Sequence, residues 1–104
     1  MTRPDDRSVA LAMAEVRRAM GKSTYRWLGE GGFTDGLGFV TAQSRLNGLR
    51  SLHSQLVGAV NREEGAKAVN LAEMMIATVN SIFAPAVAQY LCSNLLCVKQ
   101  HFAA

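Results

Sequence analysis

The feature that most constrains the fold is a long seam of apolar side chains between residues 39 and 60. Apolar positions recur there at alternating steps of three and four residues, the spacing of one face of an α-helix. Nothing in the chain reads as a series of strands at regular spacing. The pattern therefore predicts an amphipathic helix with one buried face. The seam consists of Phe39, Ala42, Leu46, Leu49, His53, Leu56 and Val60.

Helical signals also flank this segment. A first helix is expected after three side chains that can cap its start, Asp5, Asp6 and Ser8. Its apolar face follows the same spacing: Val9, Met13, Val16 and Met20. Asn61 and Glu64 have the spacing of a capping box, which predicts a new helix at that point. Pro85 either kinks one long C-terminal helix or separates two helices, and both alternatives remain open.

Five glycines between positions 29 and 38 predict a loop or hinge, after which Thr34 or Asp35 can cap the next helix. The 104 residues are expected to form a single helical domain in three parts. These are an N-terminal basic helix (1–28), a Gly-rich hinge (29–38) and a helical core (39–104). The predicted fold class is all-α, an antiparallel bundle of three to four helices that includes long amphipathic ones.

The composition favours an associating protein over a disordered one. Hydrophobic residues make up 49% of the chain and charged residues 18%, below the roughly 25% that is usual for soluble domains. Homo-oligomerisation or docking on an apolar surface would shield such a chain. Residues 74–98 carry no charge, but Asn80, Pro85 and Asn94 make a membrane span less favoured. The first sixteen residues include Asp5, Asp6 and Glu15 and lack a long apolar core, so they do not resemble a signal peptide and a cytoplasmic location is expected.

Motifs that would indicate chemistry are weak. Cys92 and Cys97 are five residues apart and point in different directions on a helix, so they are expected to be reduced, buried apolar residues. Cys97 and His101 have a chelating spacing but lack the third ligand that zinc sites need. His53 lies on the apolar seam and is expected to be a core or boundary residue. We therefore predict no catalytic residue, no cofactor and no metal.

Basic residues cluster near the end of the first predicted helix. Arg17, Arg18, Lys22 and Arg26 follow one another without an intervening acid, and they form a stripe if the helix continues past Gly21. Basic and aromatic side chains together can bind phosphates and stack on bases. The sequence thus leaves nucleic-acid binding through this possible basic patch as a less favoured alternative.

Residues 42–91 combine an amphipathic helix, a short polar break with paired acids, and a second long helix that closes on Ala-Gln-Tyr-Leu. This arrangement resembles the phasins, helical proteins that coat polyhydroxyalkanoate granules in bacteria. The resemblance implies a non-enzymatic protein that self-associates and coats or docks on an apolar surface, with a hydrophobic polymer or a protein as partner. A small helical adaptor or chaperone-like interaction subunit is the alternative. The predicted apolar interaction face is Phe39, Leu46, Leu49, Leu56, Val60, Ile76, Val79 and Phe83.

Overall fold

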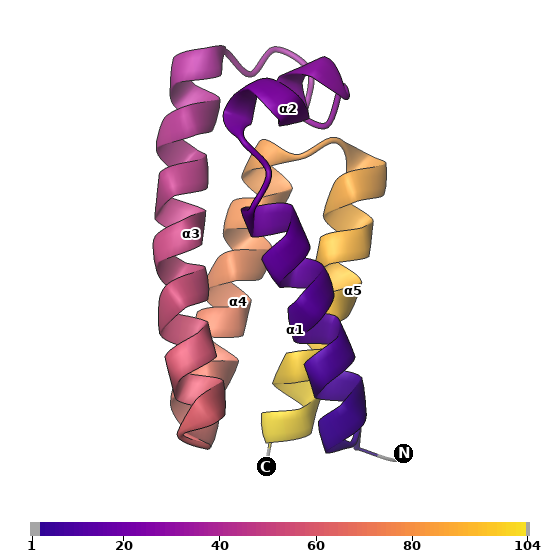
Figure 1. Cartoon of the computed structure of the whole chain (residues 1–104), viewed down its shortest axis with the longest axis vertical. Coiled ribbons are helices and arrows are strands. Elements are labelled where there is room, and N and C mark those ends of the chain that lie inside the picture. Colours follow the sequence, from indigo (N-terminus) through magenta and orange to yellow (C-terminus); the bar gives the residue numbers. More distant parts are fainter. Residues whose placement is uncertain (1–2, 104) are drawn as a thin grey trace.

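The computed structural model describes residues 3–103, and over this range it contains five α-helices. Four long helices follow the longest axis of a body that measures 38 × 23 × 19 Å, and one short helix lies across one end (Figure 1). The predicted all-α fold is confirmed. The helices are α1 (Asp6–Met20), α2 (Thr24–Gly29), α3 (Phe39–Asn61), α4 (Gly65–Ile82) and α5 (Pro85–Phe102).

The four long helices alternate in direction, so the bundle is antiparallel (Figure 1). Helix α4 lies between α3 and α5 and packs extensively on both. Helix α1 packs along α5, far from it in sequence, and contacts α3 over a much smaller area. Among the long helices that touch one another, α1 and α3 therefore have the least extensive contact. The core between the helices is formed by Leu46, Leu49, Leu56, Met75, Ile82, Leu91 and Leu95.

The N-terminal segment contains two helices because the chain breaks at Gly21. Asp5 caps α1 as predicted, and its carboxylate accepts a hydrogen bond from the backbone of Ser8 at 2.8 Å. A second cap follows at Ser23, whose hydroxyl accepts a hydrogen bond from the backbone of Arg26 at 3.1 Å. The expected basic helix over residues 1–28 is thus divided, and α2 turns away from the axis of α1.

The glycine-rich loop, residues 30–38, is tied to the turn between α4 and α5. The backbone N–H of Thr34 donates to the carbonyl of Ile82 at 2.9 Å, and that of Ala84 donates to the carbonyl of Gly32 at 2.8 Å. Left-handed backbone occurs at Gly31 (φ 67°) and Gly36 (φ 81°). The loop is therefore held at two points against the end of the bundle.

The predicted capping box at Asn61 is wrong. Helix α3 continues through Asn61, and α4 begins only at Gly65. The reversal is made by Glu63, whose backbone is left-handed with φ of 54°. Residues that cap helices are also common in turns. Asn61 and Glu64 flank the short turn between α3 and α4, so their spacing indicated that turn and not a helix that begins at Asn61.

Two other helix starts are settled by the structure. Thr34 and Asp35 do not cap α3, because Gly38 occupies the N-cap position and makes no side-chain hydrogen bond. Pro85 separates two helices. Helix α4 ends at Ile82, and Pro85 opens α5, where its missing N–H leaves no helical hydrogen bond unmade.

The uncharged stretch over residues 74–98 is divided between α4 and α5. None of the helices described over residues 3–103 combines the length and the apolarity needed to cross a membrane. Cys92 and Cys97 are both free in α5. They pack against the core but are only half-buried, so they are less buried than expected.

Candidate functional site

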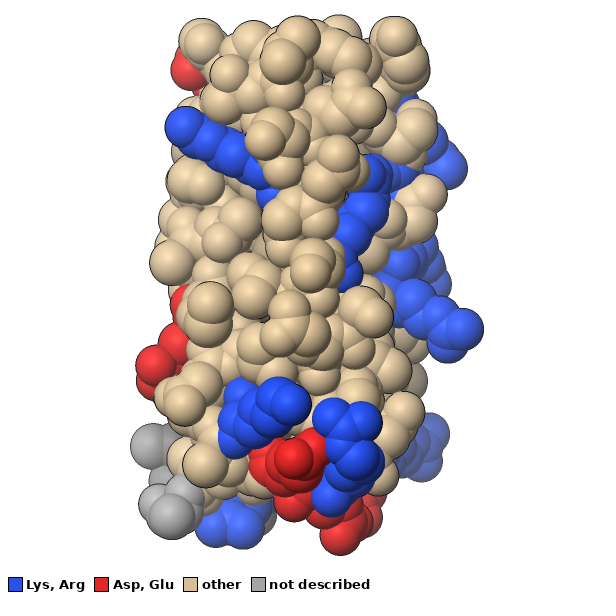
Figure 2. Space-filling model, turned by 90° about the vertical axis from the view of Figure 1, so that its left-hand side faces the viewer, with Lys and Arg blue, Asp and Glu red and all other residues tan. Residues whose placement is uncertain are grey.

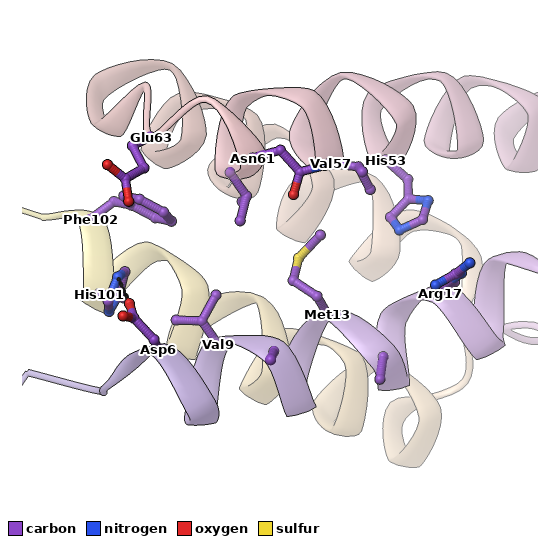
Figure 3. A pocket seen from close by; sticks show the side chains of 13 residues that line it. Asp6, Val9, Met13, Arg17, His53, Val57, Asn61, Glu63, His101 and Phe102 are labelled. Atoms are coloured by element: carbon purple, nitrogen blue, oxygen red, sulfur yellow. Dashed lines mark ion pairs between the residues drawn. The ribbon is translucent and has the colours of Figure 1, made fainter.

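A groove of about 660 Å³ opens between α1 and α3, and the last turn of α5 closes one of its ends. This volume falls within the range of about 300–1,000 Å³ that small-molecule sites occupy. Figure 3 shows the side chains of the two helices facing each other across it. Its middle is apolar and is lined by Val9, Met13, Val57 and Val60, with Phe102 near the acidic end.

The groove exists because α1 is fastened at its two ends but packs only loosely on α3 between them. At one end, Arg50 of α3 donates hydrogen bonds to the carbonyls of Met20 and Lys22, at 3.1 and 2.7 Å. At the other end, His101 of α5 contacts the carbonyl of Pro4 at 2.6 Å. These contacts hold α1 in place without filling the space beside α3.

One end of the groove is basic and contains an unsatisfied imidazole. Arg17 of α1 and His53 of α3 face each other there (Figure 3). The Nε2 atom of His53 is buried and has no hydrogen-bond partner within residues 3–103. Burial lowers the pKa of His53 below its ordinary value of 6.5, and the nearby charge of Arg17 lowers it further. The ring is therefore neutral at pH 7 and offers one N–H donor and one acceptor.

The opposite end carries acidic groups. Asp6 and Glu63 lie there together with His101 and Phe102 (Figure 3). The Nε2 atom of His101 lies 3.3 Å from a carboxylate oxygen of Asp6. Glu63 extends from the turn after α3. The groove is thus polarised along its length, with a basic end, an apolar middle and an acidic end.

The predicted apolar interaction face lies mostly inside the bundle. Five of its members are at most 2% exposed: Leu46, Leu49, Leu56, Val79 and Phe83. Phe39, Val60 and Ile76 are half-buried, and of these only Val60 lines the groove. In the folded chain this face packs against other helices, and it would meet an external surface only if the bundle opened.

The predicted basic patch is split among different surroundings. Arg17 lines the groove, whereas Arg18 lies 3.7 Å from Glu15. The other two basic residues, Lys22 and Arg26, both pair with Glu30, at 2.9 and 3.3 Å. Because α1 ends before Gly21, the condition for a continuous stripe is not met.

A smaller hollow of about 380 Å³ lies between α1 and α5, beside the paired basic residues. Lys22 sits over the ring of Trp27, with its Nζ 4.4 Å from the ring centroid. Tyr90 donates a hydrogen bond to Glu15, which raises the pKa of the Tyr90 phenol. The charged groups of this hollow are thus already partnered within the chain.

Sequence reasoning did not identify the groove as a site. It placed Arg17 in a basic run and His53 in the core or at its boundary, and nothing in the sequence brought the two together. The pattern that could have indicated the groove is the spacing of Ala10, Met13, Ala14 and Arg17. This spacing places small side chains beside a basic one on a single helical face. Within residues 3–103 no three His, Cys, Asp or Glu side chains are grouped so that they could hold a metal ion.

Comparison with protein-family models, with curated proteins and with solved structures found no match for this chain. The resemblance of residues 42–91 to the phasins therefore stays a prediction.

Proposed function

We propose that this chain is a non-catalytic binding protein that holds an elongated, largely apolar ligand in the groove between α1 and α3. The observation that carries the proposal is the groove of about 660 Å³ between α1 and α3, whose middle is lined mainly by apolar side chains and which is larger than the hollow between α1 and α5. The groove is open to solvent, so water contacts the apolar side chains that line it. An apolar ligand that displaces this water would bury those side chains, which is favourable.

The chemistry of the lining favours binding over catalysis. The thirteen residues that line the groove include no hydroxyl, thiol or lysine amine that could act as a nucleophile. Its acid–base groups are divided between the ends, with His53 at one and Asp6, Glu63 and His101 at the other. The apolar middle supplies affinity by burying ligand surface at roughly 25 cal/mol per Å². The polar ends supply orientation, as a few polar groups do in other small-molecule sites.

A second candidate is docking on an apolar surface, as the resemblance to granule coats implies. It is favoured by the exposed apolar side chains at the end of the bundle that carries α2. Tyr25, Leu28 and Val40 are 74%, 50% and 80% exposed. On the α3 side, which Figure 2 shows, this end has few charged side chains, whereas charges of both signs gather at the opposite end. Adsorption through this end would leave the core of the bundle intact.

Titration with the uncharged fluorescent probe phenylnaphthylamine separates the two candidates. Ala10 is exposed on α1 and lines the groove, so Ala10→Trp should fill the space without disturbing the core. We expect saturable fluorescence enhancement for the wild type and at least a tenfold loss of affinity for Ala10→Trp. The matched control is Ala77→Trp, an exposed position on α4 outside the groove, which should bind like the wild type.

Val40→Lys completes the comparison, because it places a charge on the exposed end. Under the groove proposal this variant retains wild-type probe affinity. If Val40→Lys abolished the signal while Ala10→Trp kept it, the groove proposal would be wrong and docking through the α2 end would be supported. Thermal unfolding of each variant verifies that the fold is retained.

A further inference from the structure

Three observations together indicate the chemical class of ligand that this groove takes. The inference rests on the proposed function. The first is the charge of Arg17. The neighbouring cations are neutralised within the chain, since Arg18 lies by Glu15 and both Lys22 and Arg26 pair with Glu30. Arg17 takes part in no ion pair within residues 3–103. Its guanidinium therefore stands at the mouth of the groove as an uncompensated positive charge.

The second observation is the imidazole opposite Arg17. The Nε2 atom of His53 is shielded from water and lacks a partner within the described part of the chain. A buried polar atom without a hydrogen bond is unfavourable, so a ligand that supplies the partner gains from it. If the ring turns so that Nε2 reaches the groove, a neutral imidazole with its proton on Nε2 would donate to an oxygen of a ligand group that Arg17 also contacts.

The third observation is the polarity of the groove. Asp6 and Glu63 at the far end repel an anion and so set the direction in which a charged ligand binds. Arg17 follows Asp6 by eleven residues, which corresponds to about 16 Å along α1. The space between them is lined mainly by aliphatic side chains, together with the carboxamide of Asn61, and has no lysine and no hydroxyl.

We infer that the groove takes a linear, single-chain carboxylate, with its head group between Arg17 and His53 and its alkyl chain running along Met13 and Val57 toward Phe102. One guanidinium and one neutral imidazole match a single negative charge. A phosphate monoester carries a second charge, and no second cation is available at this end of the groove.

The test is calorimetric titration of the full chain at pH 7.5 with decanoate and with uncharged decan-1-ol, both below the concentrations at which they aggregate. Decanoate should bind the wild type more tightly than the alcohol, and Arg17→Gln should weaken decanoate about tenfold or more. The same substitution should leave decan-1-ol unchanged. Arg18→Gln, one residue away but facing Glu15, is the matched control and should leave both ligands unchanged.

The outcomes distinguish the inference from the function on which it rests. If the two ligands bind the wild type equally and Arg17→Gln affects neither, the carboxylate assignment is overturned and the groove proposal stands. If neither ligand binds, or if Ala10→Trp leaves both affinities unchanged, the groove proposal fails and the assignment fails with it. Weakening of decanoate by Arg17→Gln alone, together with its loss in Ala10→Trp, supports both.

Discussion

Shortening Leu46 to alanine is expected to lower the free energy of unfolding by about 2–5 kcal/mol. Leu46 is fully buried in α3, where the helix packs on α4. Alanine leaves a cavity that closely packed helices refill only in part. A loss of this size is a large share of the roughly 5–15 kcal/mol that stabilises an ordinary domain. Urea denaturation monitored by circular dichroism measures it as a lower midpoint at an unchanged slope.

Leu11→Ala is the matched control for Leu46→Ala. Leu11 lies on α1 and is 60% exposed, so the same truncation there should change the free energy of unfolding by about 0.5 kcal/mol or less. The comparison bears on the predicted interaction face, to which Leu46 belongs. A decrease below about 1 kcal/mol for Leu46→Ala would mean that this side chain is not part of the core and that the face is free.

Trp27→Ala is expected to cost about 3–5 kcal/mol, because Trp27 holds the end of the bundle that carries α2. The indole is 5% exposed, and its ring centroid lies 4.8 Å from that of Phe83. Gly32 packs so closely on the indole that a Cβ at that position would lie 2.5 Å from the ring. Removing the indole therefore loosens α2, the glycine-rich loop and the turn before α5 together.

Tyr25→Ala is the control for Trp27→Ala, since it removes an aromatic ring from the same short helix. Tyr25 is 74% exposed, and its ring contacts only the half-buried Phe39 in an aromatic pair, at 4.7 Å between centroids. Its removal should cost about 1.5 kcal/mol or less. Guanidinium denaturation of the two variants provides the measurement. Equal costs for the two rings would contradict the packing of Trp27 described above.

Much of the fold could be predicted because the strongest signals are local. The steps of three and four residues that place Leu46, Leu49 and Leu56 on one face are a property of α3 alone, and all three are buried. Asp5 likewise caps the helix that directly follows it. Pro85 was ambiguous because a helix can bend or end at proline, and the outcome depends on what the preceding residues contact. Phe83 packs against Trp27 and Phe33, which ends α4 before the proline.

The candidate site could not be predicted because it depends on how helices distant in the sequence are placed. The groove opens since α1 packs on α5 instead of closing on α3, and no local pattern states that preference. Arg17 was grouped with its sequence neighbours, although Arg18 lies by Glu15 and Arg17 lines the mouth of the groove. His53 was expected to be a core or boundary residue and is half-buried, but its lack of a partner follows only from the three-dimensional packing.

Binding of a ligand in the groove between α1 and α3 can be located by nuclear magnetic resonance. Nitroxide-labelled decanoate, added to protein with labelled methyl groups, reports position because the radical broadens nearby signals. We predict strong broadening for Met13 and Val57, which line the groove, and little for Met74, which is exposed on the outer face of α4. Broadening centred on Leu28 and Val40, or equal broadening of Met13 and Met74, would contradict the account.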